Sequence, residues 1–264
     1  MESYMDQVKQ DKDNDGELDV FALTGNFDDG VVGMVASNFG DFYGFDENGK
    51  LIYTADSDNT LEALGKIQKW GDDYYRPYEN WDDYQRFWGE GNIGFFIGQS
   101  YEGFNGNSTV NAVENWGCVC FPTGPKAEAG DYTYCVDNNV FGVPAIYDEE
   151  TSLKLQKLYT LYRQNPVIDA DPDSWADRFY ALTDDRAIEE TYAYLREHGT
   201  IMNFNYIGDR YSTIGPDLTW GIRGGAAAEL VEAARPVFEN KCAIFNGDPV
   251  PEAEEAPAEE AAAE

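Results

Sequence analysis

An acidic run near the start of the chain has the composition and spacing of a calcium-binding loop. Carboxylates stand at the first, third, fifth, seventh and ninth positions of this run, and a glycine at the sixth allows a sharp bend. The pattern matches the first nine positions of an EF-hand-type loop, in which oxygen atoms surround a Ca²⁺ ion. The candidate metal ligands are Asp11, Asp13, Asp15, Glu17 and Asp19.

The acidic run also departs from the calcium-loop pattern, which leaves two interpretations open. Its twelfth position is Ala22, so the bidentate glutamate that completes the Ca²⁺ shell is absent. Calcium would then need ligands from elsewhere in the chain. The alternative is an acidic turn that leads into a strand beginning at Leu18. No cofactor is expected to be required, and any bound calcium would be structural, not catalytic.

Polar and aromatic residues stand directly after several elements that the sequence predicts. Apolar runs predict strands over residues 18–23 and 93–97, and a short helix is expected over residues 28–37. Groups that follow the carboxyl ends of strands in an open α/β sheet are placed where such folds bind small ligands. The candidate ligand-binding residues are Asn26 and Phe27 after the first strand, Asn38 and Phe39 after the helix, and Gln99, Ser100 and Tyr101 after the second strand; Asn138 and Asn139 would add hydrogen bonds from a later strand. The alternative for each of them is a structural turn residue or an aromatic at the rim.

The middle of the chain is expected to position these residues through a helix, a buried strand, an aromatic loop and a second buried strand. A helical pattern from Trp81 ends at the glycines within residues 89–91, directly before the strand over residues 93–97. The second strand is expected around Cys118 and Cys120, which would face the same side of it.

Local signals indicate the remaining elements. Asn48-Gly49 predicts a hairpin over residues 45–53, and Ser57 is expected to cap a helix whose apolar stripe ends at Trp70. Later helices are expected over residues 153–162, 184–198 and 226–240, the last interrupted by Pro236. Their leucine and aromatic stripes are expected in the core, together with Trp116 and Trp175.

The composition indicates a globular and strongly acidic body. The chain has 264 residues, of which 42% are hydrophobic, and this supplies enough apolar material for one or two domains with cores. The 18 Lys+Arg and 50 Asp+Glu give a formal net charge of −32, which excludes nucleic acid as an expected partner because phosphate binding needs basic clusters. No apolar run reaches the roughly 18 residues of a membrane span, so no transmembrane segment is expected.

The order of motifs along the chain resembles that of a known family. Residues 87–97 and the loop Gln99–Tyr101 are followed by Trp116-Gly117, Phe121-Pro122 and Gly124-Pro125, and then by Asn138 to Pro144. This order is similar to the helix-to-strand passage, aromatic loop and return strand of the extracellular solute-binding proteins of ABC importers (family 1), in particular the sugar-binding branch related to maltodextrin-binding proteins. The resemblance runs from about Asp11 to Phe245. Gly94 and Phe95 depart from it, since the family more often has Ala and Met there.

The resemblance implies an α/β, periplasmic-binding-protein-like (type II) fold and a non-enzymatic function. Such proteins capture a carbohydrate, or another small polar nutrient, between two lobes and deliver it to the permease subunits of an ABC transporter. A sugar needs flat apolar faces for its C–H side and amide or carboxylate groups for its hydroxyls, and the candidate residues offer both. The resemblance adds Trp220, before the late helix, as a further ligand-binding aromatic.

The resemblance also implies a location and a division of the chain. Family members act outside the cytoplasmic membrane, often with a lipid anchor, whereas this chain carries no recognisable export signal. Residues 1–114 and 171–246 would form the C-terminal lobe, and residues 115–170 would be the return segment of an N-terminal lobe that is mostly lacking. Residues 247–264 would be an acidic Ala/Glu/Pro tail. Without its sheet partners, the return segment is expected to be marginally stable or to self-associate.

Two other functions remain open. Paired carboxylates in an aromatic cleft are also the machinery of glycosidases, so a glycan-acting hydrolase is an alternative. Because the chain has fifty acidic residues, some pair of carboxylates is inevitable, and this signal has little specificity. An inactive fragment of a binding protein is the third possibility.

Overall fold

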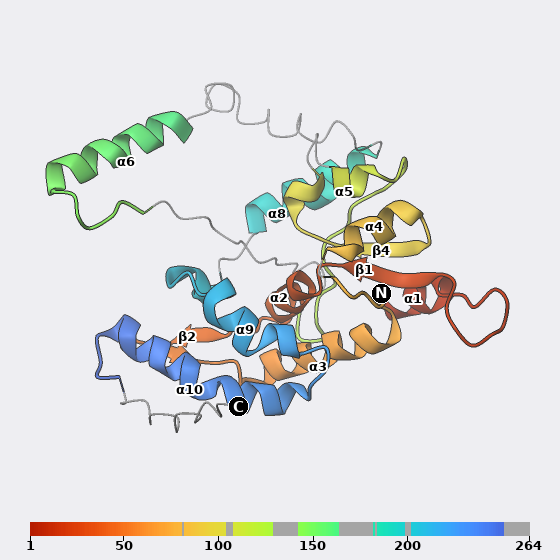
Figure 1. The fold of residues 1–264 in the computed structure, drawn as a ribbon, viewed down its shortest axis with the longest axis horizontal. Helices are drawn as coiled ribbons and strands as arrows, with labels where there is room; N and C mark the ends of the chain where they lie inside the picture. The colour runs from red at the N-terminus through yellow and green to blue at the C-terminus, as the bar shows by residue number, and fades with distance from the viewer. Residues whose placement is uncertain are drawn as a thin grey trace, which may run out of the picture.

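The described part of the chain contains two short sheets, together with α-helices and short 3₁₀- and π-helical segments (Figure 1). The computed structural model describes residues 1–80, 82–103, 108–128, 142–163, 182, 184–198 and 202–250. Their fold is mixed α/β, as the sequence predicts, with one parallel and one antiparallel sheet. Trp81, Trp175 and the tail after residue 250 lie outside the described residues.

The parallel sheet joins β1 (Phe21–Gly25) to β4 (Ile93–Ile97), with Leu23 opposite Phe95. On its other side, β1 forms a bridge from Leu23 to Tyr75. The prediction of a strand over residues 18–23 is therefore wrong at both ends. Before β1 begins, Val20 forms an antiparallel bridge with Gln10 that closes the acidic loop, and regular parallel pairing starts only after that bridge.

Two helices next to β1 follow their capping signals. Asn26 caps α2 (Phe27–Ser37) by accepting a hydrogen bond from the Asp28 amide at 3.1 Å. Ser57 caps α3 (Asp58–Asp73), which confirms the prediction, and α3 buries Leu64 and Ile67 completely against the main core. Before them, α1 (Glu2–Val8) buries Met5 in the same core, which the sequence did not indicate.

The antiparallel hairpin confirms the Asn48-Gly49 signal. It consists of β2 (Tyr43–Phe45) and β3 (Leu51–Tyr53), and Gly49 adopts a φ of 77° in the turn. The final helix, α10 (Ala227–Asn246), packs along β3 and buries Phe238 completely. It runs through Pro236 without a break, so the predicted interruption is wrong. Buried side chains on both sides of the proline anchor the helix.

The approach to β4 is also as predicted. Helix α4 (Asp83–Glu90) buries Tyr84 and Phe87 and ends at Gly91, whose φ of 78° is the left-handed conformation that favours glycine. After β4, the chain forms a 3₁₀ turn, η1 (Ser100–Gly103), and the short helix α5 (Ser108–Asn111).

The second buried strand is not formed. Residues 115–125 are all described, and none of them belongs to a strand. This segment instead packs against α2, where the Phe121 ring contacts Gly33 and the Gly124 amide donates to the Ser37 carbonyl at 3.1 Å. Trp116 is partly buried in a small cluster with Leu182. Side-chain packing on a helix replaces the strand pairing that was predicted around Cys118 and Cys120.

Helix α6 (Glu149–Arg163) has the predicted type but not the predicted environment. None of its residues is buried, and Leu153, Leu158 and Leu161 are 58%, 63% and 54% exposed. Figure 1 shows α6, in green, apart from the other elements. The expectation that its leucines lie in the core is therefore wrong for the described structure.

The remaining elements are short. A helix is present within the predicted 184–198 region, but its first part is a π-helix, η3 (Ala187–Tyr192), followed by α8 (Ala193–His198). The chain then forms η4 (Asn203–Tyr206), η5 (Arg210–Ile214), α9 (Gly215–Asp217) and η6 (Thr219–Gly221). Among the described residues, no helix has both the length and the hydropathy needed to cross a membrane.

Candidate functional site

The carboxyl ends of β1 and β4 lie together, and the loops that follow them form the candidate site. Gly25 ends β1 opposite Ile97, the last residue of β4. A Cβ at Gly25 would collide with the Ile97 carbonyl, and its φ of 134° also disfavours any other residue. The two loops therefore start from adjacent points. We call this region the ligand edge. It comprises the carboxyl ends of β1 and β4, the N-terminal turn of α2 and the η1 turn.

A buried network of charged and polar side chains crosses the ligand edge. Gln99, after β4, donates through Nε2 to Asp29 Oδ1 and Oδ2 at 3.1 and 3.2 Å. Arg210 of η5 pairs with the same Asp29 and also donates to Asp28 Oδ2 at 3.2 Å. Thr219 of η6 donates its hydroxyl to Asp28. Segments that are far apart in the sequence are thus tied to the first turn of α2.

The network holds its charges away from water. The side chains of Arg210, Asp28 and Asp29 are 6%, 11% and 10% exposed. Burial raises the pKa of the Asp29 carboxyl, while the positive charge of Arg210 opposes that rise. Burial also tends to lower the pKa of Arg210, but the two carboxylates outweigh it and hold the guanidinium charged. Asp28 and Asp29 lie in the first turn of α2, where the helix dipole favours negative charge.

A third carboxyl lies under the η1 turn. Glu102 is only 2% exposed, and its Oε2 accepts a hydrogen bond from the Gln99 amide at 2.9 Å. Burial raises the pKa of Glu102 to about 7; the nearby charge of Asp29 adds to the rise, whereas the bond from the Gln99 amide opposes it. Glu102 therefore changes its charge close to neutral pH.

The ligand edge includes some of the predicted ligand-binding residues. Asn26 caps α2 there, Ser100 and Tyr101 are exposed on the η1 turn, and Gln99 belongs to the buried network. Trp220 is 56% exposed and directly follows Thr219, which bonds to Asp28, although its indole ring lies against Gly215 of α9. Polar groups and exposed aromatic rings thus occur in the same region.

Other predicted ligand-binding residues have different environments. Phe27 is 4% exposed and packs edge-on against Tyr75, with ring centroids 5.1 Å apart, so its ring belongs to the core. Asn38 and Phe39 follow the far end of α2, about 16 Å from the ligand edge for an eleven-residue helix at 1.5 Å per residue. The Asn38 side chain is buried there and donates to the Asn59 carbonyl at 2.8 Å. Asn138 and Asn139 lie outside the described residues.

Several members of the network were missed by the sequence reasoning. Asp28 and Asp29 have a local signal, because they follow the cap residue Asn26 in the first turn of a helix. Glu102 lies within three residues of the predicted Gln99. Arg210 has no local signal at all, because it reaches the ligand edge only through the packing of η5 on α2.

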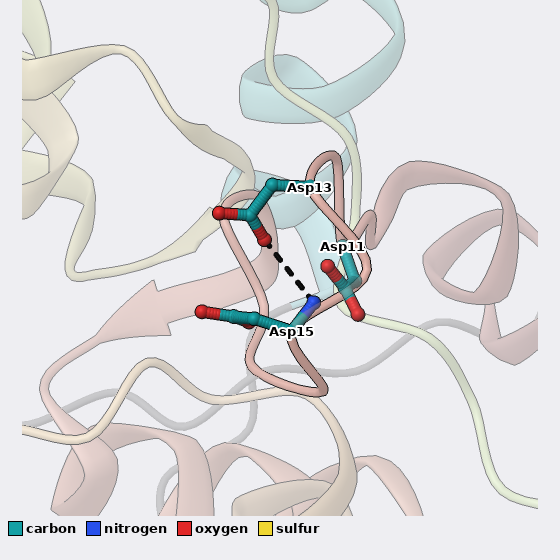
Figure 2. A group of neighbouring side chains, drawn as sticks. All are labelled: Asp11, Asp13 and Asp15. Carbon is teal, nitrogen blue, oxygen red and sulfur yellow. Dashed lines mark hydrogen bonds between the residues drawn. The ribbon is translucent and has the colours of Figure 1, made fainter.

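Three of the five candidate metal ligands lie close together in the acidic loop. Carboxylate oxygens of Asp11, Asp13 and Asp15 all lie within 4.8 Å of one another, on one exposed turn of the loop (Figure 2). Loop amides already donate to each of them, for example the Asp15 amide to Asp13 Oδ1 at 3.3 Å. Glu17 and Asp19 are outside this group; Asp19 accepts from the Lys12 amide at 2.6 Å. The geometry allows either a hard cation or a self-bonded acidic turn, so both interpretations remain.

No protein-family model matches the chain, and a search of curated proteins finds no significant match.

Proposed function

We propose that this protein is the substrate-binding component of an ABC transporter, which captures a carbohydrate or another small polar nutrient for import. Its partners would be the ligand and the permease subunits, and it would act outside the cell or at the cell surface, held by a lipid anchor. The fold would be a type II periplasmic-binding-protein-like lobe. Residues 1–114 and 171–246 would build that lobe, and residues 115–170 would return toward a second one.

The observation that carries this proposal is the ligand edge itself. It combines a side-chain amide, buried carboxylates and a guanidinium with the exposed rings of Tyr101 and Trp220. Aromatic rings stack on the apolar face of a sugar, while amide and carboxylate groups pair with its hydroxyls. The position after two parallel strands is also where open α/β sheets bind their ligands.

The bonding within the network supports capture without chemistry. Both carboxylates in the first turn of α2 already accept bonds from Arg210, and Gln99 or Thr219 adds a further bond to each. A carboxylate that already accepts bonds from a guanidinium and from a second donor is suited to orienting neighbouring donors. Hinge closure of two lobes over the ligand would be the working motion.

Calorimetry with a panel of ligands tests the proposal. The purified chain would be titrated with mono- and oligosaccharides, sugar alcohols and amino acids. At least one compound should bind, and Gln99→Ala and Trp220→Ala should each weaken Kd by about tenfold through loss of a hydrogen bond or a stacking contact. Tyr4→Ala, which removes an exposed ring on α1, is the matched control and should leave Kd unchanged.

Two results would overturn the proposal. If no compound binds, or if the two ligand-edge variants bind as well as Tyr4→Ala, the ligand edge is not the binding site. Release of new reducing ends from an oligosaccharide would instead indicate the glycan-acting hydrolase.

A further inference from the structure

We propose that Glu102 is a positioning residue whose proton holds the Gln99 segment in place at the ligand edge. The consequence for ligand capture rests on the function proposed above, whereas the proton-dependent contact is a property of the chain alone. We call this contact the Glu102 latch; it consists of Glu102 and Gln99.

The latch closes the turn after β4 through two reciprocal bonds. Glu102 Oε2 accepts from the Gln99 amide at 2.9 Å, and the Glu102 amide donates to the Gln99 carbonyl at 3.0 Å. The Gln99 side chain is bonded to Asp29 at the same time. Gln99 is therefore held by one carboxyl group at its main chain and by another at its side chain. A movement of Glu102 would release the first of these two contacts.

The environment of the Glu102 carboxyl disfavours its ionised form. The residue is 2% exposed, and its second oxygen, Oε1, has no hydrogen-bond partner in the described part of the chain. The space next to Oε2 is filled, because a Cβ at Gly98 would collide with Oε2 and with the Phe96 ring. A buried carboxylate with one unbonded oxygen carries a large desolvation cost, and the neutral acid avoids most of it.

The titratable groups around Glu102 add to this cost. Asp29 of α2 lies near it, and its negative charge opposes ionisation of Glu102. The other neighbours are Tyr84 of α4, Tyr101 of η1 and Tyr192 of η3, each of whose pKa is raised in part by the charge of Glu102. Cys118 in turn bonds to Tyr192. Among the described groups that act on Glu102 there is no cation, because Arg210 pairs with Asp28 and Asp29 instead.

Whether the contact between Glu102 and Gln99 is formed should therefore depend on the protonation of Glu102. Below a pH of about 7, the pKa of Glu102, the neutral carboxyl stays buried and keeps its bond to the Gln99 amide. As the pH rises through this value, the carboxyl loses its proton to solvent. The carboxylate then lowers its free energy by moving toward water, because its desolvation cost in the buried site outweighs the bond from the Gln99 amide. That movement frees the Gln99 amide and loosens the η1 turn. Ligand binding at this edge would then weaken as the pH rises.

NMR on the whole chain, without ligand, tests the latch directly. The Glu102 side-chain carboxyl carbon and the Gln99 amide should both titrate with a midpoint near 7, well above the ordinary glutamate value of 4.5. The exchange protection of the Gln99 amide, corrected for intrinsic rates, should fall about tenfold as Glu102 ionises. Glu102→Gln is neutral at every pH and similar in shape, so it should abolish the Gln99 titration. Glu114→Gln, at an exposed position, should not.

Specific outcomes would overturn the inference. A Glu102 midpoint near 4.5, or a Gln99 amide that still titrates near 7 in Glu102→Gln, would show that Glu102 is not the latch. The carboxyl titration of the unsubstituted chain decides the question even if Glu102→Gln folds poorly. If no compound of the ligand panel binds at any pH, the proposed function is wrong, but the Glu102 latch is unaffected. The two failures are therefore distinguishable.

Discussion

Burial raises the pKa of individual carboxyls in this strongly acidic chain. Glu102 and Asp41 both lie where burial raises their pKa, to about 7 and about 6. Asp41 nevertheless accepts bonds from the amides of Asn203 and Phe42, at 2.8 and 2.7 Å. These bonds oppose the rise in its pKa without cancelling it. Such groups favour the folded state only while they keep their protons.

Stability should therefore decrease as the pH rises from about 4.5 to about 7. In this window the folded chain retains protons on Glu102 and Asp41 that the unfolded chain has released, so the free energy of unfolding falls with pH and levels off above the folded pKa values. Glu102 should account for about 2 to 3 kcal/mol of this decrease in the free energy of unfolding. Urea unfolding across this range should show a smaller decrease for Glu102→Gln than for Glu114→Gln. Equal decreases would contradict the assignment.

The buried ion pairs of Arg210 give a second residue-scale prediction. Arg210→Met should lower the free energy of unfolding by about 3 to 5 kcal/mol, because it leaves two buried carboxylates without their cation. Arg86→Met removes an exposed arginine that pairs with Asp83 and Glu90, and it should have little effect. Chemical denaturation of both variants provides the measurement. Similar losses in the two would mean that the Arg210 network is not buried in solution.

At the scale of secondary-structure elements, a side chain of α10 forms hydrogen bonds along the open edge of β3. Asn246, at the end of α10, donates to the Leu51 carbonyl and accepts from the Leu51 amide, both at 2.9 Å. Its amide thus occupies the place that a neighbouring strand would take along β3. The Tyr53 hydroxyl adds a bond to the Val231 carbonyl at 2.7 Å. The helix therefore both packs on the hairpin and protects its open edge.

Removal of this side-chain pairing should be measurable. Asn246→Ala should reduce the free energy of unfolding by about 1 to 3 kcal/mol, because two buried backbone groups of Leu51 lose their partner. Ile244→Ala, on the same helix at a position that is 62% exposed, should reduce it by less than about 1 kcal/mol. Hydrogen exchange of the Leu51 amide should accelerate only in the first variant. Slow exchange in both would show that another group protects β3.

Elements with strong local signals could be predicted, and those that depend on tertiary contacts could not. The cap at Ser57, the turn at Asn48-Gly49 and the helix end at Gly91 are each set by a few adjacent residues. The start of β1 was misplaced because the Gln10–Val20 bridge takes precedence over apolar periodicity. At the ligand edge, Gln99 and Tyr101 were predictable from their place after a strand, whereas Arg210 was not, because its contacts with α2 are long-range.

Among the residues that the structure describes, one main cluster of buried side chains forms the core, and α6 contributes no buried residue to it. Leu64 of α3 is fully buried in the main cluster, whereas Leu158 of α6 is 63% exposed. Leu64→Ala should therefore cost about 2 to 5 kcal/mol in unfolding free energy, and Leu158→Ala less than about 0.5 kcal/mol. A large loss from Leu158→Ala would show that α6 is covered in solution, for example by the self-association expected of residues 115–170.

The pairing of Asp28 and Asp29 with Arg210 also has a consequence for the way this chain is made. Their partner is separated from them by more than 180 residues, so all of this intervening chain must leave the ribosome before the cation can meet the carboxylates. Contacts of such high sequence separation form late and slow folding. A nascent chain that has not yet reached residue 210 can complete α2 but not the ligand edge. The ligand edge would therefore be completed only after residue 210 has left the ribosome.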